Sequence, residues 1–257
     1  MEERGFNFKL QHKSYPAFEA ASTKSFFEKW GFTRWGLQTY TYDNFFDHNT
    51  RDKFVHQFFS HPEVKRTFKI YDSSDTVVNM EGLVFEKVDS QLVPATITNM
   101  DFFNPLYTNS VVRQNGDICK CFDEVVEEFL ISDELRRLIL SAESSEFSCA
   151  FSPSDRGELL FLLISHLVLG GYCCQYEDNV KPYLETTKYL YKDLLNVRKD
   201  KSTGKLYVSC TVIRVRLLDA DGVIVFPGRS NNRQNFCYMI VDPEARQMTV
   251  WYHVFSL

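Results

Sequence analysis

The chain has 257 residues, of which 44% are hydrophobic and 15% aromatic, so it can form a packed core and is not expected to be disordered. Its formal net charge is −5 at pH 7, and no dense run of Lys and Arg occurs, which argues against a nucleic-acid partner. The longest apolar run, residues 159–169, is too short for a membrane-spanning helix, which needs roughly 20 residues. The first ten residues lack the pattern of a secretory signal. We therefore expect a soluble intracellular protein with no nucleic-acid or membrane partner.

Seven cysteines, an odd number, are typical of free thiols in a reducing compartment. Two close pairs stand out, Cys119/Cys121 and Cys173/Cys174. Structural zinc sites usually space their cysteines as C-x2-4-C, and neither pair has that spacing. We therefore expect no metal ion and no cofactor.

The first 118 residues show both helical and strand patterns. Proline lacks a backbone amide and clashes with the preceding helical turn, so Pro62 is expected to end one of the helices. The patterns predict helices over residues 22–32 and 50–64, and strands over residues 36–42, 65–72 and 76–89.

Residues 119–195 are predicted to be mainly helical. Residues 122–143 indicate two helices that separate near Ile131, with Ser132 as the N-cap of the second. Residues 152–171 indicate a further helix, with Ser152 as its cap and glycines at its end. That helix is apolar on all sides, which is typical of a helix buried at the centre of a fold.

The last part, residues 196–257, changes to a period of two. Three β-rich stretches, 205–219, 236–242 and 247–255, are separated by short turn signals, which favours an antiparallel β-meander. In the first stretch one side is apolar, while Arg214 and Arg216 lie on the other. The prediction is one globular α+β domain over residues 1–257, with a mixed N-terminal region, central buried helices and a C-terminal antiparallel meander.

The stretch "CCQYEDNVKPYLETTKYLYKDL", residues 173–194, is rich in tyrosine and acidic residues. A helix beginning near Pro182 would place five residues on one side, and such a stripe usually packs into the core. The five are Tyr183, Thr187, Leu190, Tyr191 and Leu194.

The same stretch also suggests a surface for a protein partner. Tyrosine is enriched at interfaces because it combines a large, stiff contact area with a polar tip. Neighbouring carboxylates would suit a basic partner. The candidate partner surface comprises Tyr176, Glu177, Asp178, Tyr183, Glu185, Tyr189 and Asp193.

An alternative is a small carboxylate- or metal-dependent enzyme that uses Glu177, Asp178 and Glu185. That alternative requires these acids to cluster with His166 or His253 in a buried cleft. Metalloprotease, nucleophile-elbow, phosphate-loop and dinucleotide-binding motifs are all missing from the sequence. We therefore expect no enzymatic activity and no catalytic residues.

Three stretches resemble the cilia- and flagella-associated protein 300 family. They are "FLISDELRR" (residues 129–137), "CQYEDNVKPYLETTKYLYKDL" (174–194) and "IVDPEAR" (240–246). The chain length and the ending "VWYHV" are similar as well. The resemblance is strong from about Cys119 to the end and looser over the first hundred residues.

This resemblance implies a non-enzymatic factor for the assembly or transport of outer and inner axonemal dynein arms, which drive ciliary and flagellar motility. It further implies action in the cytoplasm with preassembly factors such as kintoun, contact with dynein chains or intraflagellar transport, and a place in the motile cilium. A stable structural component of the axoneme is the remaining alternative. The family supplies no catalytic or cofactor-binding residues to transfer.

Overall fold

The computed structural model describes residues 5–72, 74–140 and 150–255, which fall into two compact units. Unit 1 contains residues up to Ser14, Thr33–Val93 and the chain from Ser209 onward, and unit 2 contains Tyr15–Phe32 and Pro94–Val208. The prediction of one domain over residues 1–257 stays a prediction, whereas the predicted α+β class is confirmed.

Unit 1 is built on one antiparallel sheet. Its strand order is β1 (Phe8–Gln11), β2 (Trp35–Tyr42), β13 (Gln247–His253), β12 (Phe236–Asp242), β10 (Thr211–Leu218) and β11 (Ile224–Phe226), and β5 (Lys87–Val93) also pairs with β10. The predicted C-terminal antiparallel strands are therefore confirmed, except at the start of the first one. Of the strand predicted over residues 205–219, Leu206–Val208 form a separate strand in unit 2, and only β10 joins this sheet. The sequence did not predict that strands from the first hundred residues extend the same sheet.

Helices and a hairpin complete unit 1: η1 (His48–Thr50), α3 (Arg51–Ser60), α4 (Pro62–Thr67), β3 (Lys69–Tyr71), β4 (Val77–Asn79) and η2 (Met80–Gly82). The strand predicted over residues 65–72 is wrong in its first half, which belongs to α4. Pro62 follows the end of α3 but also begins α4, because its missing amide costs nothing in the first turn of a helix. The strand predicted over residues 76–89 is divided between β4, η2 and β5.

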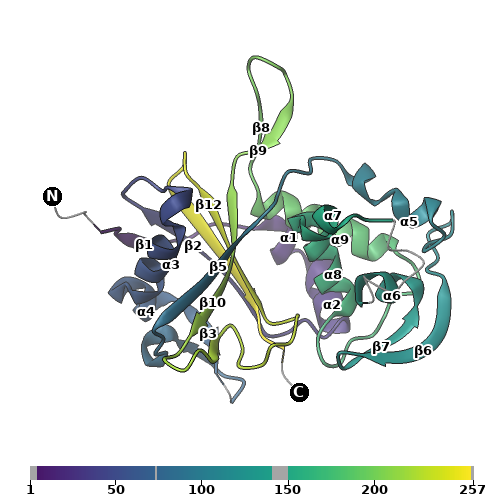
Figure 1. Cartoon of the computed structure of the whole chain (residues 1–257), viewed down its shortest axis with the longest axis horizontal. Helices are drawn as coiled ribbons and strands as arrows, with labels where there is room; N and C mark the ends of the chain where they lie inside the picture. Colours follow the sequence, from purple (N-terminus) through teal and green to yellow (C-terminus); the bar gives the residue numbers. More distant parts are fainter. Residues whose placement is uncertain (1–4, 73, 141–149, 256–257) are drawn as a thin grey trace. The chain divides into compact units, whose positions relative to one another are not determined.

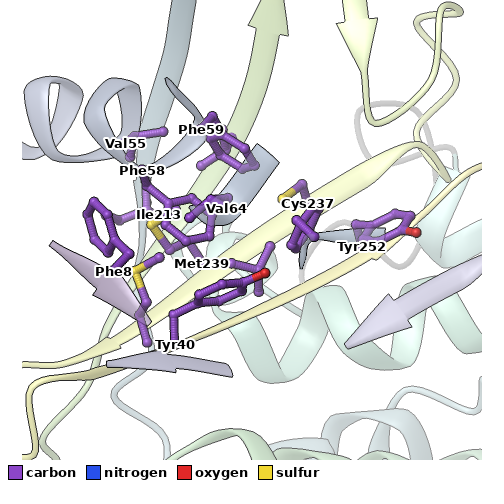
Figure 2. Close-up of a cluster of buried hydrophobic side chains, with 14 of the residues drawn as sticks. Phe8, Tyr40, Val55, Phe58, Phe59, Val64, Ile213, Cys237, Met239 and Tyr252 are labelled. Carbon is purple, nitrogen blue, oxygen red and sulfur yellow. The ribbon is translucent and has the colours of Figure 1, made fainter. Parts of the chain in front are cut away.

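Aromatic rings fill the core of unit 1. The ring of Phe58 on α3 lies edge-on to Phe8 and Tyr40, with 5.1 Å between ring centroids in both pairs. Figure 2 shows these rings packed against Ile213 and Met239 from the sheet. Edge-to-face packing aligns the positive edge of one ring with the negative face of the next, so the rings contribute more than their buried area alone.

Unit 2 is mainly helical (Figure 1). Its helices are α1 (Pro16–Glu19), α2 (Ala21–Lys29), η3 (Met100–Phe103), α5 (Pro105–Thr108), α6 (Glu134–Leu140), α7 (Pro153–Gly157), α8 (Leu159–Leu169) and α9 (Lys181–Leu194). Its strands form two hairpins, β6 (Lys120–Val126) with β7 (Phe129–Asp133), and β8 (Val197–Lys199) with β9 (Leu206–Val208).

The buried central helix is confirmed as α8, preceded by the short α7. Every α8 residue except Leu162 is buried. Ser152 and Asp155 form a reciprocal capping box at the start of α7. Gly170 has a φ of +65°, a left-handed conformation that ends α8 and that glycine adopts without strain.

The two helices predicted over residues 122–143 are partly wrong. Residues up to Asp133 form the β6–β7 hairpin, and Glu127 and Glu128 turn it with positive φ values of 50° and 72°. The helix that follows is capped by Asp133 instead of the predicted Ser132, because Asp133 Oδ1 accepts a 2.9 Å hydrogen bond from the Arg136 amide. Residues 141–143 of that prediction lie outside the described residues. In the described chain, no helix is long and apolar enough to cross a membrane.

Gly36 on β2 tests how tightly the sheet of unit 1 is packed. A methyl group added at Gly36 would lie 2.4 Å from a ring carbon of Tyr252, whose hydroxyl donates a 2.9 Å hydrogen bond to the Lys69 carbonyl. We expect Gly36→Ala to lower the free energy of unfolding by about 1–3 kcal/mol, measured by urea denaturation. The matched control is Gly82→Ala, where no atom lies within 4 Å and a change within about 0.5 kcal/mol is expected. Equal values for the two variants would contradict the prediction.

Candidate functional site

The segment from Gly170 to Val180 connects α8 to α9 and lies against the end of α2. The Gly171 amide donates a 2.8 Å hydrogen bond to the Trp30 carbonyl, and the Gln175 amide donates a 2.9 Å bond to the Lys29 carbonyl. The approach is close enough that a methyl group at Gly171 would lie 1.8 Å from the Gly31 oxygen. Backbone contacts and glycines therefore fix the start of the stretch that carries the candidate residues.

The carboxylate of Glu177 is held inside unit 2. Its Oε1 accepts a 3.0 Å hydrogen bond from the buried indole Nε1 of Trp30 and lies 2.7 Å from Lys29 Nζ. Only 13% of its side chain is exposed. Because an indole N–H must find an acceptor when it is buried, Glu177 has a structural role in addition to any role at the surface.

The ring of Tyr183 is fully buried beside Trp30, with 4.7 Å between ring centroids. Its hydroxyl accepts hydrogen bonds from the Glu177 amide, at 3.1 Å, and from Arg136 Nη2, at 3.3 Å. Burial raises the pKa of this phenol well above its usual value, so it stays neutral and serves as an acceptor for two donors.

Arg136 on α6 connects the surrounding segments, although it is completely buried. Its guanidinium forms an ion pair with Asp133 and lies 3.2 Å from the ring centroid of Tyr176. Nη2 also donates to the Val168 carbonyl, at 3.4 Å. A buried guanidinium needs this many partners because its desolvation costs several kcal/mol. Burial raises the pKa of Tyr176, although the guanidinium opposes the shift.

Asp178 faces solvent at the point where the stretch runs beside residues 116–118. Its carboxylate lies 2.6 Å from Lys120 Nζ, and this hydrogen bond lowers the pKa of Asp178. Its carbonyl accepts a 2.8 Å bond from the Ile118 amide, and the Val180 amide donates a 2.9 Å bond to the Gly116 carbonyl.

The predicted core face of α9 is confirmed. Tyr183, Thr187, Leu190, Tyr191 and Leu194 are all buried. Glu185 and Tyr189 are exposed, and Glu185 Oε1 lies 3.9 Å from Lys181 Nζ. Asp193 is half-buried, and its Oδ2 accepts a 2.7 Å hydrogen bond from the Ala17 amide in the first turn of α1.

The structure thus separates the seven candidate residues into two groups. Tyr176, Glu177 and Tyr183 come together around Trp30 and Arg136, and Asp193 is bound to α1. Asp178, Glu185 and Tyr189 remain at the surface. Sequence reasoning missed Trp30 and Arg136. A signal was present for Arg136, since an arginine three residues after an aspartate in an apolar helix suggests a buried ion pair.

The carboxylates of the alternative enzyme hypothesis do not share a site. Glu177, Asp178 and Glu185 contact three different lysines, which are Lys29, Lys120 and Lys181. Within the part of the chain that the structure describes, no three His, Cys, Asp or Glu residues are placed to hold a metal ion.

The two histidines of that hypothesis are both buried. His166 lies in the interior helix α8. His253 Nδ1 lies 2.7 Å from the Gln234 carbonyl, and burial lowers the pKa of its ring to about 4.

Comparison with known proteins shows which family this α+β chain resembles. A model of the family described as cilia- and flagella-associated protein 300 matches residues 5–253. A protein of that name from Chlamydomonas reinhardtii is 38% identical over 248 residues, 94% of this chain and 95% of the relative. One of the same name from Paramecium tetraurelia is 31% identical over 251 residues, 94% of this chain and 93% of the relative. No solved structure matches the chain.

The chain therefore belongs to the cilia- and flagella-associated protein 300 family. This confirms the resemblance recognised in the three sequence stretches. The similarity is also wider than those stretches indicated, because it covers most of the first hundred residues as well.

Arg136 and its neighbour Arg137 form a matched pair for measuring the buried contact. Arg136→Met leaves the Asp133 carboxylate buried without its cation, so we expect a loss of about 3–5 kcal/mol in the free energy of unfolding. Arg137 is 29% exposed and pairs with Glu134 at 3.1 Å, so Arg137→Met is expected to cost less than about 1 kcal/mol. Urea denaturation followed by tryptophan fluorescence measures both values, and similar losses would contradict the buried pair.

The adjacent Cys173 and Cys174 are expected to differ in reactivity. Cys173 is exposed, whereas burial raises the pKa of Cys174 to about 12 and keeps its thiol protonated at neutral pH. Only the thiolate attacks an alkylating reagent, so iodoacetamide at pH 7.5 should modify Cys173 at least about tenfold faster. Peptide mass spectrometry after timed quenching measures the two rates. Unfolding in urea is the control and should make the rates similar.

Proposed function

We propose that this protein is a non-enzymatic factor for the assembly or transport of outer and inner axonemal dynein arms. In this proposal it acts in the cytoplasm and in the motile cilium or flagellum. The observation that supports the proposal is membership, over nearly the whole chain, of a family named for cilia and flagella. The part that concerns dynein arms rests on the resemblance of its sequence stretches to that family.

The protein would act by binding other proteins, among them kintoun-like preassembly factors, dynein chains or components of intraflagellar transport. The exposed residues of the stretch, Asp178, Glu185 and Tyr189, are the contacts we propose. The backbone that carries these exposed side chains is fixed by three partly or fully buried residues. Glu177 accepts a hydrogen bond from Trp30, and Arg136 contacts both the ring of Tyr176 and the hydroxyl of Tyr183. A prearranged surface binds with a smaller loss of conformational entropy than a mobile one.

Deletion of the gene in a ciliated cell tests this function. We expect axonemes that keep their microtubules but lack outer and inner dynein arms, seen by electron microscopy of cross-sections, together with loss of motility. Normal arms in the deleted cell would overturn the proposal. Protein that stays on the microtubules through high-salt extraction, along with the arms, would instead indicate a stable axonemal component.

Rescue with variants then tests the surface. Asp178→Lys combined with Glu185→Lys should fail to restore the arms and should lose co-purifying dynein-related proteins, while the protein remains folded. The control combines Glu28→Lys with Asp123→Lys, which makes the same change in net charge at two exposed acids elsewhere in unit 2 and should restore the arms. Restoration by both variants would remove Asp178 and Glu185 from the interface without affecting the proposed function.

A further inference from the structure

Unit 2 has an open groove of about 540 Å³ that the candidate surface does not include. Its apolar lining comes from Ile97, Met100, Leu160, Tyr191, Leu195 and Val197. Lys188 and Lys192, one turn apart on α9 and both exposed, form one rim. We call this feature the basic groove. It is large enough for several side chains, and it offers apolar contact with cations on one side.

The chain around the basic groove is strongly cationic, although the whole protein carries a net charge of −5. Residues 188–205 contain six Lys and Arg against two Asp. Both carboxylates are engaged within the chain: Asp193 accepts from the Ala17 amide, and Asp200 accepts from Ser202 and Thr203. These hydrogen bonds lower the pKa of Asp200 to about 2, so it stays ionised but points into its own turn.

The lysines of this region are not neutralised by the rest of the described chain. Lys188, Lys192, Lys199, Lys201 and Lys205 are all exposed, and none of them forms an ion pair with a described residue. An uncompensated group of exposed cations attracts acidic ligands and increases their rate of association.

The β8–β9 hairpin continues the surface, because Val197 both lines the basic groove and begins β8. Val197 pairs with Val208, and Lys199 pairs with Leu206, so these four side chains share one face of the hairpin. Val197 and Leu206 are 46% and 57% exposed, so the hairpin adds apolar side chains to the surface beside the groove. Figure 1 shows the hairpin as a two-stranded ribbon that stands away from the helices of unit 2.

We propose that the basic groove and the β8–β9 hairpin together bind an extended acidic segment of a partner protein, in which acidic and apolar side chains alternate. Alternate residues of an extended chain lie about 6.5 Å apart and point the same way, while the residues between them point to the other side. Lys188 and Lys192 have the i, i+4 spacing of about 5–6 Å. Two carboxylates of such a segment can therefore pair with the two lysines, while its apolar side chains contact the groove lining and Val197.

A nucleic acid fits this surface less well than a protein segment. Single strands bind by stacking their bases on exposed aromatic rings. The apolar lining of the groove is aliphatic except for Tyr191, which is buried and whose hydroxyl donates a 2.8 Å hydrogen bond to the Ile97 carbonyl. On the hairpin Tyr207 is exposed, but it pairs with Arg198 on the face opposite Val197 and Lys199. Aliphatic side chains suit the leucine-like residues of a peptide.

Binding is tested with the purified full-length protein and a short fluorescein-labelled peptide that alternates glutamate and leucine. We expect saturable binding by fluorescence anisotropy that weakens as NaCl is raised. Lys188→Glu combined with Lys192→Glu should weaken binding about tenfold or more and should gain binding of the matching lysine–leucine peptide. Leu206→Ser, at an exposed position, should weaken binding without affecting folding.

The control protein combines Lys9→Glu with Lys24→Glu, which makes the same change in net charge at exposed lysines outside the groove and hairpin and should bind like the wild type. No saturable binding by the wild type, or equal loss in both double variants, would overturn the proposal. So would an RNA oligonucleotide that displaces the peptide and needs the same lysines, or self-association of the chain that needs them.

The binding measurement uses purified protein and needs no cilium. The acidic ligand of the basic groove is a proposal separate from the role in dynein-arm assembly or transport. If the peptide does not bind but cells without the gene lose their dynein arms, only the proposed ligand of the basic groove is contradicted. Peptide binding with normal arms would contradict the proposed function alone.

Discussion

The buried guanidinium of Arg136 is the interaction on which the arrangement of unit 2 depends. An unpaired charge in the interior would cost several kcal/mol, so folding requires all of its partners to be in place together. Those partners come from four segments: Asp133 at the end of β7, Val168 near the end of α8, Tyr176 in the connecting segment, and Tyr183 on α9. One side chain thereby fixes how α9 lies against α8.

A second set of contacts fixes the connecting segment, which has no regular secondary structure of its own. Glycines at 31, 170 and 171 let its backbone approach the end of α2, and Glu177 satisfies the indole of Trp30. Backbone groups outside helices and sheets must still be paired when they are buried. Here the Trp30 and Lys29 carbonyls provide that pairing, so an irregular stretch can present Asp178 in a defined position.

The sequence predicted well those elements whose pattern matches their burial, such as α8, α9 and the C-terminal strands. It failed for the β6–β7 hairpin because Phe122, Val125 and Val126 repeat with helical spacing among good helix-forming glutamates. The hairpin turn provides no local signal either. Glu127 and Glu128 adopt positive φ, where Asn-Gly or Asp-Gly is the usual marker.

The candidate site was predictable in composition but not in its division between surface and interior. The tyrosine and acid content of residues 173–194 is visible in the sequence. The burial of Glu177 depends on Trp30, which is 147 positions away along the chain, and that of Tyr183 on Arg136, 47 positions away. Contacts at such separations leave no periodic pattern, so neighbouring acids such as Glu177 and Asp178 look equivalent until the fold separates them.

This separation also determines how the charges of the stretch can be interpreted. A lysine at 177 would place an ammonium group beside Lys29 and leave the Trp30 indole without its acceptor, so a loss of binding there would report damage to the fold. Asp178 and Glu185 have no comparable interior contact.

The dipole of α9 favours cations near the C-terminus of the helix, so it explains the presence of Lys192 in the last turn without any ligand. It does not account for Lys199, Lys201 and Lys205, which lie beyond the helix on the β8–β9 hairpin. Asp200 offsets one of these three charges, and the mutual repulsion that remains is reduced when an anionic group of a ligand lies between the lysines. The hairpin lysines are therefore the evidence for an acidic ligand. Lys188 and Lys192 on α9 would bind the part of that ligand that lies along the groove.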